Sequence, residues 1–167
     1  QRPMIALEPQ PVLFQNLCAN LALNGLLNAR AWPYACGAQS GTVYFPEPNY
    51  AEAGNFGGVA MQTNGGKAHI AMPVVRLDDL LGNGPVGLMK IDVEGMESEV
   101  LEGASNILTA SRPVLYVEND RQEKSAALIE WLWAQNYRLW WHTPPLFNPD
   151  NFFGLTENIY PRLASCN

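Results

Sequence analysis

The sequence lacks the features that mark several classes of protein. It carries 10 Lys and Arg residues against 16 Asp and Glu, for a formal net charge of −6, and no basic cluster. Binding to a phosphate backbone depends on such clusters, so no nucleic-acid partner is expected. No apolar run approaches the ~18 residues of a membrane span, and no signal-peptide pattern opens the chain. We therefore expect no membrane association and a cytoplasmic location.

Cysteine and histidine are too few and too scattered to form a framework. Cys18, Cys36 and Cys166 are far apart and odd in number, so they are expected to be reduced thiols. His69 and His142 have no companion Cys or His at ligand spacing, so no metal site is predicted. A G-x-G-x-x-G match over 82–87 precedes a strand, whereas a phosphate-binding loop follows one. We interpret it as a turn.

One stretch, residues 86–103, organises the sequence. Its first six residues form an apolar run bounded by Gly and Pro, which is typical of a strand buried on both faces. Apolar residues then recur at helical spacing: Met96, Val100, Leu101, Ala104, Ile107 and Leu108. The pattern predicts a strand that turns directly into one amphipathic helix. Ligands gather at the carboxyl ends of parallel strands, so Asp92 and Glu94 lie where chemistry is expected.

Strands and helices alternate along the rest of the chain. Apolar and aromatic runs predict strands over 4–7, 29–35 (broken by a proline), 42–45, 58–62, 70–75, 113–117 and 137–142. Helices are expected over 11–24 and 124–136, with a short helical turn over 76–81. The alternation predicts βαβ units and a parallel sheet, and we interpret residues 1–167 as a single domain.

Three of the predicted strands end on acidic residues, namely Glu8, Asp92 and Glu118. Because the carboxyl ends of parallel strands share one edge of a sheet, the three carboxylates are expected to face one crevice. Glu8 ends a strand that opens a βαβ unit, where an acid commonly accepts hydrogen bonds from both hydroxyls of a ribose. The alternative is a surface charge that a helix dipole favours.

Lys90, Asp92 and Glu94 alternate and are expected to share one face of the strand. A lysine in a buried strand needs a carboxylate partner, for which Asp92 and Glu118 are candidates. The set is either a structural ion-pair network or a site where Asp92 or Glu94 accepts a proton from a substrate hydroxyl. His142, at the end of another predicted strand, is either a further base or an ordinary strand-end histidine.

Five segments follow one another in an order that one protein family shares: Ile5–Pro9, Val75–Leu80, Met89–Glu97, Val100–Ala104 and Arg112–Glu118. Through them nearly the whole chain resembles the FkbM-type S-adenosylmethionine-dependent methyltransferases. The resemblance implies an α/β, Rossmann-like methyltransferase fold with a mostly parallel sheet and helices on both faces. It also implies S-adenosylmethionine as cofactor and methyl transfer to a hydroxyl of a sugar or other small metabolite.

The resemblance also implies residue roles. Glu8 would hold the cofactor ribose, Ala35 and Cys36 would border the adenine, and Asp92 would lie beside the cofactor. Asp92 and Glu94 would face the methyl-transfer site, with Glu118 nearby. Family members carry a further strand and a Gly-rich loop before the strand that ends at Glu8, where this sequence has seven residues. We therefore expect a fold that is incomplete at its N-terminus.

Two other hypotheses remain open. A non-catalytic α/β fragment could associate with a second copy of itself through its incomplete sheet, because missing strands leave an edge exposed. A different nucleotide-binding enzyme could use the same crevice, but the sequence offers no phosphate loop for it.

Overall fold

The structure is a computed structural model, and it describes residues 3–52, 56–57, 64, 69–143, 145, 147–152 and 154–158. The chain divides into two compact units, Gln1–Leu128 and Ile129–Asn167. The predicted strand over 58–62 and Cys166 lie outside the described residues. In the part of the chain that the structure describes, no helix has the length and apolar character needed to cross a membrane.

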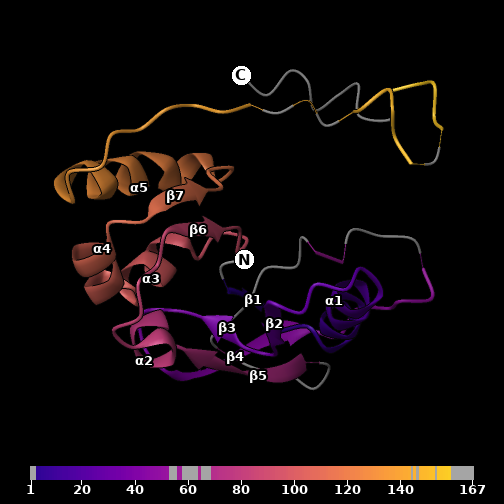
Figure 1. The fold of residues 1–167 in the computed structure, drawn as a ribbon, viewed down its shortest axis with the longest axis horizontal. Helices are drawn as coiled ribbons and strands as arrows, with labels where there is room; N and C mark the ends of the chain where they lie inside the picture. The colour runs from indigo at the N-terminus through magenta and orange to yellow at the C-terminus, as the bar shows by residue number, and fades with distance from the viewer. Residues whose placement is uncertain are drawn as a thin grey trace. The chain divides into compact units, whose positions relative to one another are not determined.

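The first unit opens with a βαβ motif, as the sequence predicts. Strand β1 (Met4–Leu7) pairs in parallel with β2 (Ala29–Trp32), and helix α1 (Pro11–Leu23) joins them and packs on β2 (Figure 1). Pro11 stands at the first turn of α1, where its missing N–H costs nothing. Gly25 follows the C-cap residue Asn24 and adopts a positive φ of 63°, a conformation common where helices end.

A second, three-stranded sheet follows. Pro33 separates β2 from β3 (Ala35–Cys36), so the predicted strand over 29–35 is split into two strands that belong to different sheets. Strand β3 pairs in parallel with β5 (His69–Val75), and β5 pairs on its other side with antiparallel β4 (Gly41–Pro46). The core of this sheet contains Ala35, Val43 and Val74.

The organising stretch forms the third sheet. Strand β6 (Leu88–Ile91) pairs in parallel with β7 (Val114–Val117). Helix α2 (Leu77–Leu81) precedes β6, and α3 (Glu97–Glu102) and α4 (Ser105–Ser111) form the crossover between the two strands. Helices α2 and α3 both contact α4 (Figure 1).

The prediction of one continuous helix after β6 is wrong, because α3 and α4 are separate. The break falls at Gly103 and Ala104, and glycine is a poor residue for a helix interior. A Cβ added to Gly103 would lie 2.1 Å from the backbone oxygen of Gly37, so the chain bends where another segment passes closely. The buried side chain of Asp78 then accepts hydrogen bonds from the backbone N–H groups of Asn106 (3.1 Å) and Ile107 (3.0 Å) and so caps α4.

The prediction that the strand over 86–91 is buried on both faces is also wrong. Burial alternates along β6: Met89 and Ile91 are buried, whereas Leu88 is 65% exposed and the Lys90 side chain 58%. Val114 on β7 is similarly 64% exposed. The β6–β7 sheet therefore presents one face to solvent, and the single mostly parallel sheet with two helical layers is not formed by the described residues.

Helix α5 (Gln122–Ala134) begins in the first unit and ends in the second. Its Leu128 and Leu132 are buried, as predicted, whereas Ala127 is exposed. The predicted strand over 137–142 is wrong, since those residues are an irregular segment in which Trp140 and Trp141 are each 75% exposed. Runs of aromatic residues favour strands. Residues 137–142 pair with no strand of the described residues, so no ladder of backbone hydrogen bonds stabilises them in that form.

Candidate active site

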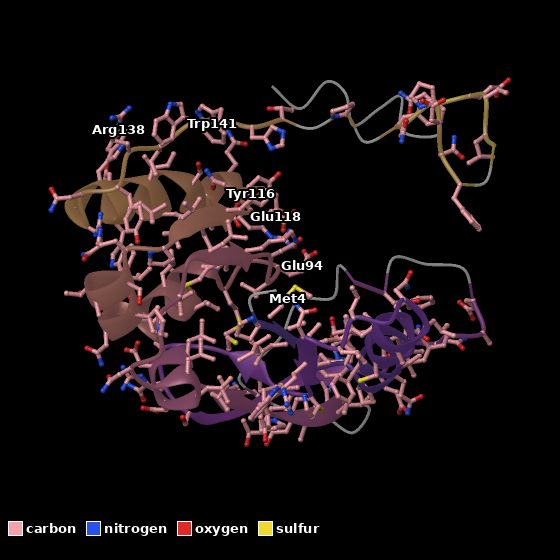
Figure 2. The ribbon with its side chains drawn as sticks, in the orientation of Figure 1. Met4, Glu94, Tyr116, Glu118, Arg138 and Trp141 are labelled. Atoms are coloured by element: carbon pink, nitrogen blue, oxygen red, sulfur yellow. The ribbon has the colours of Figure 1, made fainter. Side chains whose placement is uncertain are left out.

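The parallel pairing of β6 and β7 brings two acids to one end of the sheet. Ile91 is in register with Val117, and the backbone N–H of Glu118 donates to the Ile91 oxygen over 2.9 Å. Asp92 and Glu118 therefore directly follow a pair of residues that are in register on neighbouring strands. Figure 2 shows Glu94 and Glu118 at this carboxyl end of the β6–β7 pair. The predicted gathering of carboxylates at strand ends is correct for Asp92 and Glu118, and Glu94 lies close to both.

Asp92 is the acid that stays ionised. Its carboxylate pairs with the ammonium group of Lys90, two residues earlier on β6. The hydrogen bond from Lys90 lowers the pKa of Asp92, a further hydrogen bond with Glu118 acts in the same direction, and partial burial opposes both. The predicted partnership of Lys90 with Asp92 is confirmed, although Lys90 is exposed rather than buried.

Glu118 is the acid that keeps its proton. Partial burial, together with the hydrogen bond and the charge of Asp92, raises the pKa of Glu118 to about 7. Its Oε2 atom is buried, and no N–H or O–H donor of the described residues reaches it. Because the pKa of Asp92 is lowered and that of Glu118 is raised to about 7, the pair holds one proton and one negative charge between these two values.

Glu94 sits in a strained turn directly after Asp92. Its φ is 54°, which is rare for a residue with a side chain and costs about 1–3 kcal/mol, and Gly95 follows at a φ of 95°. The carboxylate of Glu94 accepts a hydrogen bond from Arg121 over 2.7 Å. Burial raises the pKa of Glu94, and the Arg121 charge opposes that change. The turn is also held by buried Glu97, which accepts from the Gly95 N–H over 2.9 Å.

One carboxylate oxygen from each of Asp92, Glu94 and Glu118 lies within 4.8 Å of the other two. This spacing would admit a divalent cation, but two of the three carboxylates already have a cationic partner in Lys90 and Arg121. Exposed acidic groups commonly gather without an ion, so the cluster does not by itself define a metal centre. The acids can instead accept and hold protons.

Glu8 follows β1, whose ladder with β2 is extended by a bond from the Glu8 N–H to the Trp32 oxygen (3.2 Å). One carboxylate oxygen of Glu8 accepts the backbone N–H of Gln10 over 2.8 Å, and burial raises the pKa of the group. No donor of the described residues is bonded to its other oxygen. Glu8 is not part of the cluster that Asp92, Glu94 and Glu118 form, and that Glu8 faces the same crevice as Asp92 and Glu118 stays a prediction.

Ala35 and Cys36 are buried, with 2% and 8% of their surfaces exposed. Burial also raises the pKa of the Cys36 thiol to about 11, so the group stays protonated at neutral pH. Ala35 packs in the core of the three-stranded sheet, so contact between β3 and an adenine would have to use backbone atoms. The adenine-bordering role of both residues stays a prediction.

Several functional candidates escaped the sequence analysis. Gln10 is 6% exposed, and its side-chain amide donates to the Phe56 oxygen over 2.7 Å. Arg121 and Lys124 reach the turn at Glu94 and Gly95 from the start of α5. The sequence does contain a signal for these two residues, because basic residues are unusual at a helix N-terminus, where the helix dipole favours acidic ones. His142 lies in the second unit and outside any strand, so its role as a base stays a prediction.

In α/β chains with parallel strands, ligands gather at the carboxyl ends of the strands, but that arrangement is shared by many functions. Comparison with known families is more specific, since residues 3–139 match the methyltransferase FkbM domain. The match covers most of the 167 residues, so this chain belongs to the FkbM methyltransferase family. The resemblance stated from the sequence is therefore confirmed.

A curated relative agrees with the family assignment. The chain is 33% identical over 133 residues to the methyltransferase sdnD of Sordaria araneosa. The matched region is 62% of this chain and 51% of the relative, so the chain spans about half the length of that protein. No solved structure matches the chain.

Proposed function

We propose that this chain carries the acid–base centre of an S-adenosylmethionine-dependent O-methyltransferase whose acceptor is a hydroxyl of a sugar or other small metabolite. The observation that carries the proposal is the Asp92–Glu118 pair, which follows the paired strands β6 and β7 with carboxylate oxygens within 4.8 Å of each other. The pKa of Asp92 is lowered and that of Glu118 is raised to about 7. Membership of a methyltransferase family supplies the reaction class. Free thiols at Cys18 and Cys36 agree with a reducing, cytoplasmic setting.

The residues that fit the cofactor lie at the end of β1. Glu8 offers a half-buried carboxylate with one oxygen fixed by Gln10 and the other without a donor among the described residues. That geometry suits a vicinal diol such as the hydroxyls of a ribose. When bound, S-adenosylmethionine would supply an electrophilic methyl group. The role of Glu8 in our proposal is to bind and orient, and it takes no part in proton transfer.

The acid pair handles the proton of the acceptor. A hydroxyl becomes a better nucleophile as its proton passes to a fixed base, and Asp92 is the ionised carboxylate of the pair. Lys90 keeps Asp92 ionised before the reaction, and Glu118 donates to it and fixes its orientation. Once Asp92 has taken the proton, the pair holds two protons and can release one to solvent, because both side chains are partly exposed.

Transfer of tritiated methyl groups from S-adenosylmethionine to a panel of monosaccharides and hydroxylated metabolites tests the proposal. Asp92→Asn keeps the size of the side chain and removes the base, so turnover should fall by about 10²-fold or more. Asp79→Asn, an exposed acid on α2, is the matched control and should leave turnover unchanged. Full activity of Asp92→Asn would remove Asp92 from the mechanism.

A second candidate function, self-association, is favoured by the exposed apolar residues of the two-stranded sheets. Among the described strands, β1 pairs only with β2 and β6 only with β7. The exposed apolar side chains on these strands are Met4, Ile5, Leu88, Val114 and Tyr116. Open edges and apolar faces of this kind recruit partners, and a second copy of the chain would meet the requirement.

Sedimentation over a range of protein concentrations tests self-association. A dimer that Leu88→Lys and Val114→Lys convert to a monomer would support it, because both substitutions place a charge on the exposed face. Lys substitution of Leu23, which is exposed on α1, is the control. A monomer at all concentrations rules this function out.

A further inference from the structure

The start of α5 holds charges that its own helix does not favour. Arg121 precedes the helix, and its backbone oxygen accepts from the N–H groups of Lys124 (2.9 Å) and Ser125 (3.0 Å). Arg121 therefore occupies the N-cap position, and Lys124 stands in the first turn. Cations at a helix N-terminus oppose the helix dipole, and N-caps are usually Ser, Thr, Asp or Asn. A local rule broken in this way indicates a requirement elsewhere in the fold.

Both cationic side chains bind the turn after β6. The guanidinium of Arg121 donates to the Glu94 carboxylate over 2.7 Å, and the ammonium of Lys124 donates to the Gly95 oxygen over 2.5 Å. Arg121 also lies within 3.6 Å of Asp120. A Cβ added to Gly95 would lie 3.5 Å from the Arg121 side chain and 3.7 Å from the Lys124 nitrogen. The two side chains therefore cover the turn closely.

The turn needs such support, because Glu94 and Gly95 both adopt positive φ. A residue with a side chain keeps that conformation only when its surroundings determine it. Buried Glu97 holds the N–H of Gly95, and Lys124 holds its oxygen. Among the described residues, Arg121 alone forms an ion pair with the Glu94 carboxylate, one oxygen of which lies within 4.8 Å of carboxylate oxygens of Asp92 and Glu118.

We propose that Arg121 is a positioning residue that holds the Glu94 carboxylate beside the Asp92–Glu118 pair, with Lys124 fixing the backbone of the same turn. The inference deepens the proposed function and rests on it, since it gives Glu94 a fixed place beside the proton-accepting pair. Arg121 acts through Glu94 and need not touch the substrate. A comparison limited to the motif after β6 would not identify this role, because Arg121 lies 27 residues beyond Glu94 in the chain.

Carbon-13 NMR of the glutamate carboxyl groups tests the placement without cofactor or acceptor. Loss of one signal in Glu94→Gln assigns Glu94. Arg121→Met should move the Glu94 signal, Arg121→Lys should restore it in part because the charge remains, and Arg30→Met, an exposed arginine on β2, should leave it unchanged. An unmoved Glu94 signal in folded Arg121→Met overturns the proposal.

Methyl transfer to the same acceptor panel gives the functional readout. Arg121→Met should lower kcat by about tenfold or more with little change in KM, because misplacement near the reacting group acts on turnover. In a Glu94→Gln background the same substitution should add nothing, because Arg121 acts through Glu94. Equal losses in both backgrounds overturn the proposal.

The two proposals fail separately. If Arg121→Met leaves turnover intact while Asp92→Asn abolishes it, the proposed function stands and the positioning role falls. If the wild-type chain transfers methyl groups to no acceptor and binds no S-adenosylhomocysteine, the proposed function falls, and the NMR signals alone then decide whether Arg121 positions Glu94. Loss of folding in Arg121→Met is recognised from its amide spectrum, and Arg121→Lys then supplies the measurement.

Discussion

Substitution of Glu118 by Gln should change how the stability of the protein depends on pH. The pKa of Glu118 is raised from an ordinary value of 4.5 to about 7, first by burial and then by the hydrogen bond and charge of Asp92. Below pH 4.5 the group is protonated in both the folded and the unfolded chain, so its favourable contribution is fully present. As the pH rises through 7 that contribution is lost, because the folded state must then hold two neighbouring carboxylates.

The size of the effect follows from the same values. A fully buried group with this change in pKa would lose about 3 kcal/mol between pH 4.5 and pH 8. Glu118 is only partly buried and solvent screens its charge, so we expect about 1 kcal/mol. For a domain of this size that loss is a fall of about 2–4 °C in Tm. The lowered pKa of Asp92 changes the stability only below pH 3.8, which lies outside the range from pH 4.5 to pH 8.

The assay compares urea unfolding of the wild type and Glu118→Gln at pH 4.5 and pH 8. The amide of Gln is neutral at both values and can still donate to Asp92, so the variant should gain about 1 kcal/mol on the wild type as the pH rises. Taking the difference between the two proteins cancels the contributions of all groups that the two proteins share. A difference that is the same at both pH values would refute the assignment of the proton to Glu118.

Two further predictions concern the scaffold. Asp78→Asn should lower the free energy of unfolding by about 2–3 kcal/mol, because the buried carboxylate caps α4 through two backbone N–H groups, whereas Asp79→Asn should change it by less than about 0.5 kcal/mol. Gly103→Ala should cost about 3 kcal/mol or more, because its Cβ would meet the Gly37 oxygen at 2.1 Å, whereas Gly41→Ala has open space and should change little. Urea unfolding at pH 7 measures all four variants, and a Gly103→Ala protein of wild-type stability would contradict the close approach of the two segments.

The local features of the fold were predictable from the sequence. Most strands and the helix α1 follow from the apolar patterns of the sequence. The gathering of Asp92 and Glu118 was predictable as well, because it needs only that two neighbouring strands run in parallel. The strand itself sets the position of residues close to its end.

The features that failed depend on contacts between distant segments. The break between α3 and α4 requires the approach of Gly37 to Gly103, and no helical periodicity reports on that contact. The exposure of Lys90 and Leu88 depends on what covers β6, which an apolar run cannot specify. Arg121 reaches Glu94 across 27 residues, so the local sequence around either residue does not reveal the pair.

Calorimetric titration of the chain with S-adenosylhomocysteine tests the central claim most directly. The proposal predicts saturable binding of one ligand per chain, weakened by about 10- to 100-fold in Glu8→Gln, since that substitution removes a charged acceptor from the ribose. Glu123→Gln, an exposed acid on α5, should bind as the wild type does. The absence of binding to the wild type, or equal binding to wild type and Glu8→Gln, would contradict the account.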